Sequence, residues 1–300
     1  MPRILISFAV GAIWILPFLV ASTPAILIGG AWGIAGKYLG MAVALPIFAI
    51  TFILVAGLIS RFGKRGIVKG KFPRELKNPV YFARALYGAA WTQLFYFRPL
   101  YAVALAVPPL RTFMFRIFGY SANLDFTLYP DTWIRDLPIL NVGKGAYLSN
   151  RSTIGTNMCL TDGSILVDGI EIAEKSMVGH LTMLAPGVKI GGESEVGVGC
   201  AMGIRVKIGN KVSIRPSTTV NHGCHLEDGC EIGTMSFIGL RAHVGPGIKI
   251  KAGANIPAGA NILSQEEAEQ YFSSETQTLQ AQKESILKTL ESHLGMGNVP

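Results

Sequence analysis

The hydrophobic positions of this chain follow a six-residue period from Val142 to Ile262. An aliphatic residue or methionine stands at every sixth position of this stretch, twenty-one times in succession. A small or β-branched residue follows most of these positions four places later, as at Ser152, Cys200 and Thr218. A period of six matches neither an amphipathic helix nor an alternating strand, so we expect short strands that each bury one large and one small side chain. The pattern therefore predicts a solenoid.

Two uncharged runs precede the repeat. No charged residue occurs between Arg3 and Lys37, and none occurs from Tyr38 to Ser60. Each run is longer than the ~20 apolar residues that cross a bilayer core, so residues 1–60 are predicted to form two transmembrane helices, at residues 4–21 and 39–59. A cleaved signal peptide is the alternative for the first run, but a second apolar run follows so closely that a membrane helix is favoured.

A basic segment follows the second run directly. Seven Lys and Arg residues lie between Arg61 and Lys77 against one acidic residue, Glu75, whereas the connection between the two runs carries only Lys37. The positive-inside rule then places both termini and the solenoid on the cytoplasmic side of a bacterial-type inner membrane. Much of the net charge of +8 comes from this segment, where anionic lipid headgroups would meet it. No aromatic-interleaved binding motif accompanies it, so nucleic acid is not an expected partner.

Residues 61–120 are expected to form a basic linker and helices along the membrane surface. Two uncharged pieces, residues 85–97 and 99–110, are rich in aromatic residues and are separated by Arg98. Each piece is too short to span a bilayer, which favours interfacial helices over a third and a fourth pass.

The solenoid domain is assigned to residues 121–263, and both of its ends need covers. Residues 129–138, which include Trp133, are expected to cover the first coil. Residues 264–300 carry charges and a near-heptad row of apolar residues from Phe272 to Leu294, which predicts a C-terminal helix. That helix would cover the far end or pack against its copies in an oligomer.

The six-residue repeat resembles that of the hexapeptide-repeat acyltransferases, whose fold is a left-handed parallel β-helix. The resemblance implies a mainly β domain in which three hexapeptides make one triangular coil, so that twenty-one repeats give about seven coils. Residues eighteen apart would then stack on one another, and the unbroken count predicts that no long loop leaves the coils. The same resemblance implies a homotrimer, with acetyl-CoA or another acyl-CoA as the co-substrate.

A looser resemblance covers more of the chain. Two apolar runs, the basic segment VKGKFPRELKNPVYFARALYG, then FRIFGYSANL and the repeats follow one another in an order similar to the C-terminal membrane region of poly-lysine-type peptide synthetases. This order leaves open a non-catalytic role, in which the solenoid is a membrane-held scaffold for an assembly.

His222 is the first candidate for chemistry, in the stretch TTVNHGCHLEDGCEIG. It stands two places after Val220, and Cys224 takes the small inward position of the repeat. This stretch is similar to the V-x-H-D-C signature of the sugar and sialic-acid acetyltransferases. The resemblance implies that His222 is the general base of a direct acyl transfer, with acetyl-CoA in the cleft between neighbouring subunits. The chain departs from the signature at Gly223, where that branch has Asp, so the histidine lacks one acidic neighbour.

The eighteen-residue coil predicts which residues surround His222. Ile204 and Leu240 would lie one coil below and one coil above it and give it apolar walls. Two basic columns are expected beside them, one formed by Arg205, Gly223 and Arg241 and the other by Lys207, His225 and His243. We expect this edge to bind the phosphates of CoA or an anionic acceptor, with Gly223 making room between two arginines. A solvated corner without function is the alternative.

His180 is the second candidate, at the same repeat position on a different face. Asp162 is expected one coil below it, where a carboxylate would orient and charge the ring. This pair would be either a local ion pair or a catalytic dyad.

The cysteines Cys159, Cys200, Cys224 and Cys230 lack metal-site spacing, and three of them occupy the small inward position. We therefore expect free thiols in a reducing compartment and no metal. The letters H-G-C at His222 also resemble the motif of γ-class carbonic anhydrases, but a zinc site there needs three histidines. The membrane segments favour a cell-envelope sugar or a lipid-linked precursor as the acceptor, with transfer to oxygen or to nitrogen left open.

Overall fold

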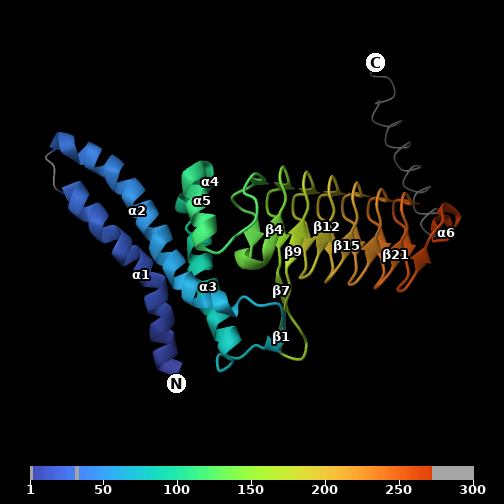
Figure 1. The fold of residues 1–300 in the computed structure, drawn as a ribbon, viewed down its shortest axis with the longest axis horizontal. Helices are drawn as coiled ribbons and strands as arrows, with labels where there is room; N and C mark the ends of the chain where they lie inside the picture. The colour runs from blue at the N-terminus through green and yellow to red at the C-terminus, as the bar shows by residue number, and fades with distance from the viewer. Residues whose placement is uncertain (1–2, 31–33, 272–300) are drawn as a thin grey trace, which may run out of the picture.

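The computed structural model describes residues 3–30 and 34–271 of the chain. Its N-terminal part is helical, its C-terminal part is a parallel β-solenoid, and a short helix lies at the far end of the solenoid (Figure 1). A single cluster of buried apolar side chains runs from the first helix through the solenoid to the last helix, so the helical part and the β part share one core.

The first two helices are α1 (Arg3–Gly30) and α2 (Ile34–Gly63), which lie side by side (Figure 1). Both are long and apolar enough to cross a membrane, over the stretches Gly11–Ile28 and Ala42–Gly66. This agrees with the predicted pair of transmembrane helices, whereas the orientation of the pair in a membrane stays a prediction. A 3-10 turn at Lys64–Gly66 and the strand β1 (Gly70–Pro73) follow within the basic segment.

Three shorter helices follow: α3 (Pro79–Tyr96), α4 (Arg98–Ala106) and α5 (Pro108–Ile117). The side chain of Asn78 starts α3 by accepting the backbone amides of Val80 and Tyr81, and Pro79 suits the first helical position. The pair α4 and α5 bends by 114° and is apolar enough to count as one broken span. The interfacial position of this pair stays a prediction.

Helix α3 covers the first coil of the solenoid. Its side chains Tyr87 and Trp91 are fully buried, and the Trp91 indole donates a hydrogen bond of 2.6 Å to the carbonyl of Ile134. Residues 129–138 lie against the coil that starts at Val142, as expected, but they do so as part of a further coil, since the strand β3 (Trp133–Ile134) pairs with Thr153–Ile154. Tyr87, Trp91 and Phe95 of α3 thus pack on protein, whereas Phe82 and Tyr96 of the same helix are exposed.

The solenoid has three parallel sheets of seven strands. The first sheet contains β2 (Thr127–Leu128), β5 (Tyr147–Leu148), β10 (Met177–Val178), β13 (Glu195–Val196), β16 (Ser213–Ile214), β19 (Glu231–Ile232) and β22 (Lys249–Ile250). The second contains β3 (Trp133–Ile134), β6 (Thr153–Ile154), β11 (Met183–Leu184), β14 (Ala201–Met202), β17 (Thr219–Val220), β20 (Phe237–Ile238) and β23 (Asn255–Ile256). The third contains β4 (Leu140–Val142), β9 (Ile170–Ile172), β12 (Lys189–Ile190), β15 (Lys207–Ile208), β18 (His225–Leu226), β21 (His243–Val244) and β24 (Asn261–Ile262). The hand of the coil stays a prediction.

The predicted burial pattern is confirmed in the regular coils. Val196, Ile214 and Ile232 are fully buried and stack eighteen residues apart in neighbouring strands. The small inward residues do more than fill space, because their hydroxyls donate to carbonyl groups fifteen residues further on. The Thr182 hydroxyl lies 2.6 Å from the carbonyl oxygen of Gly197, which satisfies a polar group that would be costly to bury alone.

A hairpin interrupts the coils, contrary to the expectation of an unbroken count. Its strands β7 (Asn157–Cys159) and β8 (Ser164–Val167) are antiparallel, and β8 also pairs with β1 from the basic segment. The inward residues Ile154 and Ile172 of neighbouring sheets are thus eighteen places apart instead of six. The twelve extra residues equal two repeats. The six-residue pattern therefore continues in phase through the hairpin, and the pattern alone does not reveal that a hairpin is present.

The far end of the solenoid carries α6 (Gln265–Gln270). Ser264 and Glu267 form a capping box at its start, and the Gln265 side chain pairs with both backbone groups of Lys249 in the last coil. Ala268 is buried against this end, so a helix covers it as predicted. The remainder of the expected C-terminal helix, from residue 272 onward, lies outside the described residues.

Candidate functional site at a basic corner of the solenoid

The predicted column of Arg205, Gly223 and Arg241 is present at the corner between the second and third sheets. The amide of Gly223 donates to the carbonyl of Ile204 and the amide of Arg241 donates to that of His222, which fixes the stacking. Gly223 has a φ of +71°, and a Cβ placed there would lie 3.3 Å from Cγ of Arg241. Glycine therefore makes room at this corner, as expected from the sequence.

The two arginines of this column differ in their partners. The Nε atom of Arg205 lies 3.1 Å from a carboxylate oxygen of Asp168, the residue that follows the hairpin strand β8. Arg241 is exposed and makes no ion pair with a described residue. The positive charge of Arg241 is thus available to an anionic ligand, whereas that of Arg205 is partly compensated. Sequence reasoning missed Asp168 because the hairpin was not predicted.

His222 is exposed, and its ring is fixed by one hydrogen bond. The backbone amide of Ile204 donates to Nδ1 of His222 over 2.8 Å, so the neutral ring carries its proton on Nε2. The same repeat position at another corner holds Asn210 and Asp228, whose side-chain oxygens accept backbone amides from one coil below. His222 therefore fills a structural position of the coil and in addition presents a titratable ring to solvent.

The predicted column of Lys207, His225 and His243 lies on the third sheet next to this corner. The rings of His225 and His243 stack with 5.3 Å between centroids. Both ring nitrogens of His243 have partners at 2.7 Å, Nδ1 with the Asn261 side chain and Nε2 with the carboxylate of Glu227. The hydrogen bond that Glu227 accepts from the ring raises the pKa of His243. Glu227 thus supports His243, and the His225 side chain makes no hydrogen bond with a described residue.

One group of side chains on this face has the composition of a metal site. Ligand atoms of His225, Glu227 and His243 all lie within 4.8 Å of one another. Two imidazoles and one carboxylate are a known donor set for zinc. Each ring nitrogen of His243 already faces an oxygen, however, so an ion would have to displace one of these contacts. The expectation of no metal stays a prediction.

The prediction that Asp162 stacks one coil below His180 is wrong. Asp162 lies in the turn of the hairpin and forms an ion pair of 2.5 Å with Lys71, far from any stacking position beneath His180. The hydrogen bonds from Lys71 and Ser164 hold the pKa of Asp162 below its usual range. The half-buried His180 stacks over Asn150, which cannot charge the ring as a carboxylate would. The hairpin adds twelve residues to this coil, so the residue stacked beneath His180 is Asn150 and not the expected Asp162.

The four cysteines are free thiols. Cys200, Cys224 and Cys230 are buried at small inward positions, and burial raises the pKa of Cys230 to about 12. Protonated thiols in these positions act as packing, as the sequence predicted. Cys159 is exposed on the hairpin instead.

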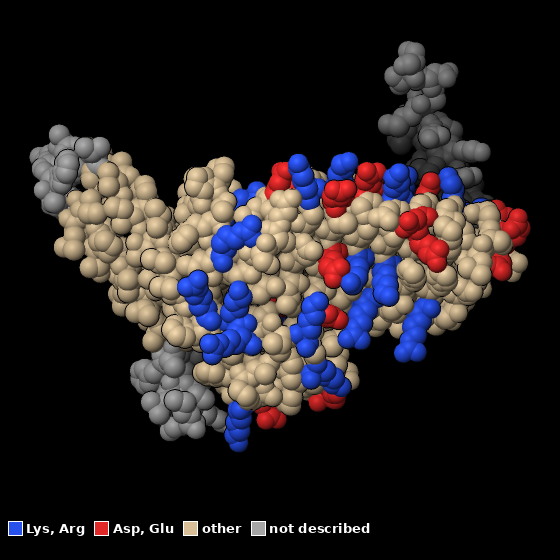
Figure 2. Space-filling model, in the orientation of Figure 1, with Lys and Arg blue, Asp and Glu red and all other residues tan. Residues whose placement is uncertain are grey.

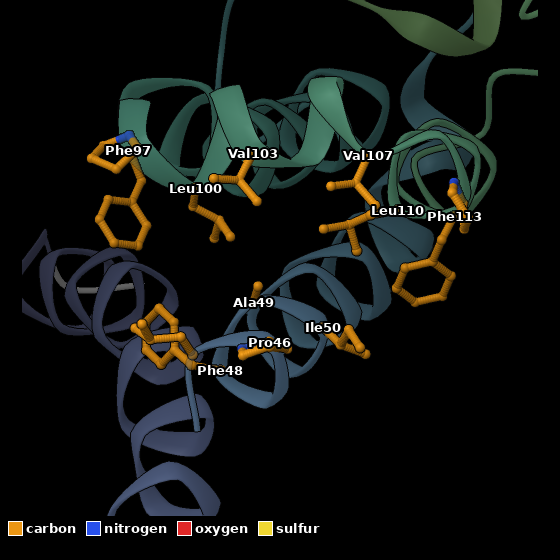
Figure 3. Close-up of a pocket in the computed structure, with 13 residues that line it drawn as sticks. Pro46, Phe48, Ala49, Ile50, Phe97, Leu100, Val103, Val107, Leu110 and Phe113 are labelled. Atoms are coloured by element: carbon orange, nitrogen blue, oxygen red, sulfur yellow. The ribbon is translucent and has the colours of Figure 1, made fainter. Parts of the chain in front are cut away.

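An apolar cavity of about 710 Å³ lies in the helical part, between α2 and the bent pair α4 and α5 (Figure 3). Phe48, Phe97, Val103 and Leu110 are among its lining residues, and all thirteen are apolar. The cavity borders the second candidate span, so its walls match the hydrocarbon of a membrane. Periodicity in the sequence gave no sign of it, because it depends on the bend between α4 and α5.

No protein-family model and no curated protein matches the chain. Among solved structures it is similar to WeeI from Acinetobacter baumannii, with 27% identity over 32% of this chain and a TM-score of 0.29, and it spans half the length of WeeI. A maltose O-acetyltransferase from Clostridium difficile is similar over 63% of this chain and 91% of its own, with 14% identity and a TM-score of 0.34. The acetyltransferase domain of PglB from Neisseria gonorrhoeae, in complex with acetyl coenzyme A, covers 53% of this chain and 59% of its own, with 15% identity and a TM-score of 0.14.

Proposed function

We propose that this chain is an acyltransferase held at a membrane, which transfers an acyl group from acetyl-CoA or another acyl-CoA to a hydroxyl or amine of its acceptor. The observation that supports this most directly is the exposed imidazole of His222 at a rigid corner, next to the uncompensated charge of Arg241. Arg241 and Lys207 suit the phosphates of CoA or an anionic acceptor, because guanidinium and ammonium groups bind phosphate by charge and hydrogen bonds.

In the proposed reaction His222 takes the proton of the acceptor group. The acceptor oxygen or nitrogen attacks the thioester carbonyl carbon, its proton passes to a ring nitrogen of His222, and the C–S bond breaks. The proton then leaves on the sulfur of CoA, so the imidazole returns to its neutral form. Acyl transfer is direct, and Cys224 is not a nucleophile because it is buried.

The hydrogen bond from Ile204 sets a condition on this role. While Nδ1 accepts the amide proton, Nε2 carries the ring proton and lacks a free lone pair. The exposed ring can turn away from Ile204 at a cost of about 1 kcal/mol, the net value of one hydrogen bond. General acid–base catalysis contributes about 10²- to 10⁴-fold to a rate, or roughly 3–5 kcal/mol, so this cost is compatible with catalysis.

Two further parts of the proposal concern partners. We propose a homotrimer in which the acyl-CoA lies in the cleft between neighbouring subunits beside His222. A lipid-linked sugar or another cell-envelope precursor is the proposed acceptor, supported by two helices long enough to cross a membrane and by the apolar cavity beside α2.

The substitutions H222A and H222N test the catalytic role. Asn210 shows that an asparagine side chain accepts the amide of the coil below at this repeat position, so H222N should preserve the corner while removing the imidazole. We expect both variants to lower acyl transfer at least ~100-fold, measured as release of CoA thiol in the presence of a lipid extract from cell envelopes. Activity of H222N close to that of the unsubstituted protein would show that the histidine is only structural.

A scaffold without catalysis is the second candidate function. The equivalence of His222 with the structural residues Asn210 and Asp228 favours it. The two functions differ in ligand binding, because a ligand that binds the folded state raises the melting temperature. Protection of the purified protein by acetyl-CoA supports the transferase, and absence of protection at saturating acetyl-CoA supports the scaffold.

A further inference from the structure

A second cavity lies where the membrane helices meet the solenoid. Its volume is about 300 Å³, and its walls come from α1, α3, the segment after β1, the hairpin and the first coil. Three arginines line it, Arg74, Arg84 and Arg135, and no acidic residue does. In Figure 2, Lys and Arg side chains gather at this junction of the helical part with the solenoid. The cavity therefore presents a concentration of positive charge.

Two of these arginines are incompletely paired. Arg84 is 2% exposed, and its Nη2 atom lies 2.7 Å from a carboxylate oxygen of Asp136, but its Nη1 atom has no partner among the described residues. The Arg135 side chain makes no ion pair and no hydrogen bond with a described residue, and its guanidinium is 6.0 Å from the centroid of the Trp133 ring. Burial lowers the pKa of Arg135, and the charge of the neighbouring Asp136 offsets only part of this effect. One carboxylate thus serves two guanidinium groups.

The guanidinium of Arg135 lies over a glycine of α3. A Cβ built at Gly88 would stand 3.1 Å from Nη2 of Arg135, and Gly88 itself lines the cavity. The absence of a side chain at this position leaves the guanidinium open toward the cavity. Buried unpaired charges are costly, so the arrangement favours a ligand that brings a negative charge and several hydrogen-bond acceptors.

The cavity lies at the level where candidate membrane spans begin and end. Trp14, on its wall, is near the start of the first span at Gly11. Arg84 is beside the end of the second span, since its backbone nitrogen would lie 2.4 Å from a Cβ built at Gly66. Tryptophan is typical of membrane–water interfaces, and lipid phosphate groups lie at the same depth.

We propose that this cavity binds the phosphate group of a membrane lipid, with Arg135 and the free Nη1 of Arg84 as donors. A phosphate offers the charge and the oxygens that these two groups lack, and the adjoining α1 and α2 leave its hydrocarbon chains in the bilayer. Free inorganic phosphate has the same chemistry without the chains, so the experiment has to separate the two sources. The proposal concerns binding alone and stands independently of catalysis at His222.

The test uses the full chain in mild detergent micelles with dioctanoyl phosphatidic acid, dioctanoyl phosphatidylcholine or inorganic phosphate, and follows the melting temperature and bound lipid by native mass spectrometry. We expect phosphatidic acid to stabilise the protein at lower concentration than inorganic phosphate does. R135Q should weaken this binding at least ~10-fold, since a hydrogen bond to a charged group is at stake. R65Q is the matched control, because Arg65 is an exposed cation of the same basic segment and does not line the cavity. We expect R65Q to bind phosphatidic acid within about twofold of the unsubstituted protein, in line with the small effect of exposed charges.

Three outcomes would overturn the proposal. Equal losses in R135Q and R65Q would mean general attraction to a basic surface. Equal stabilisation by inorganic phosphate and phosphatidic acid would make the site one for free phosphate, and no stabilisation by the lipid would leave the cavity without this ligand. If R135Q does not fold, A89L replaces it, because Ala89 lines the cavity and leucine would fill it without changing any charge.

Discussion

Replacing Asp136 by Ala should destabilise the contact between the helical part and the solenoid. Asp136 is 1% exposed and Arg84, on α3, is 2% exposed, so the ion pair between them is shielded from water. One carboxylate oxygen of Asp136 accepts from Nη2 of Arg84 over 2.7 Å and from the Thr156 hydroxyl over 2.5 Å. D136A removes this oxygen and leaves a buried guanidinium without an anion.

The expected loss can be estimated from this geometry. Removing one partner of a buried ion pair costs about 3–5 kcal/mol, because the remaining charge stays out of water. The Thr156 hydroxyl loses its acceptor as well, which adds about 1 kcal/mol. Nη1 of Arg84 already lacks a partner among the described residues, so no second contact takes over. The exposed pair of Lys249 and Glu231, whose side chains are 67% and 44% exposed, should by contrast contribute at most ~1 kcal/mol.

Thermal unfolding in mild detergent can separate these two cases. Trp91 and Trp133 lie at the junction and their fluorescence reports on it. D136A should lower the free energy of unfolding by at least ~3 kcal/mol, and E231Q, the control, by less than ~1 kcal/mol. Equal and small effects of the two substitutions would refute the reasoning, since they would mean that water reaches the Arg84 side chain.

Two further predictions concern the coils. T182V should lower the free energy of unfolding by about 1–2 kcal/mol in chemical denaturation, because the Thr182 hydroxyl donates to the Gly197 carbonyl and accepts from the Cys200 amide. V178I, at a buried large position, is the control and should not reproduce this loss of polar contacts. An unchanged free energy of unfolding in T182V would mean that the hydroxyl does not contribute to stability. The raised pKa of His243 means that its contact with Glu227 stabilises the fold fully below the unfolded pKa of about 6.5 and loses this effect as pH rises through the folded pKa. E227Q should therefore lower the melting temperature at pH 5.5 more than at pH 8.5, and an equal shift at both values would contradict the ion pair.

The repeat predicted the coils well because burial imposes it on every strand. Within the coils, a large residue at each sixth place, such as Ile214 or Ile238, fills the interior between the three sheets. The hairpin was not predicted because its twelve extra residues keep the six-residue pattern in phase. Leu160 and Leu166 match this pattern although they do not lie in the coils. The signal that could have exposed it is the pair Asp162–Gly163, since Asp-Gly is typical of a hairpin turn.

For the candidate site, the sequence predicted which residues stack on one another but not which atoms their side chains contact. Stacking at eighteen residues placed Arg205 with Arg241 and His225 with His243 correctly. Side-chain directions do not follow from a repeat, so the sequence left open that Glu227 faces His243 and that Nδ1 of His222 is occupied. These contacts depend on rotamers and on the neighbouring coils, which periodicity does not describe.

The two proposed sites lie along one edge of the solenoid. Asp136, beside the phosphate cavity, and His222 both follow strands of the second sheet by two residues, in its first and its fifth strand. Four strand spacings of ~4.8 Å separate them by about 19 Å along the stack. The hairpin leaves the same edge after β6, and Asp168 at its base contacts Arg205 near His222. A phosphate at Arg135 is therefore too far away to belong to a small acceptor that reacts at His222. On the proposed function, a lipid-linked acceptor would need several sugar-sized units between its phosphate and its reacting group to occupy both sites, and a simple phospholipid would be too short to do so.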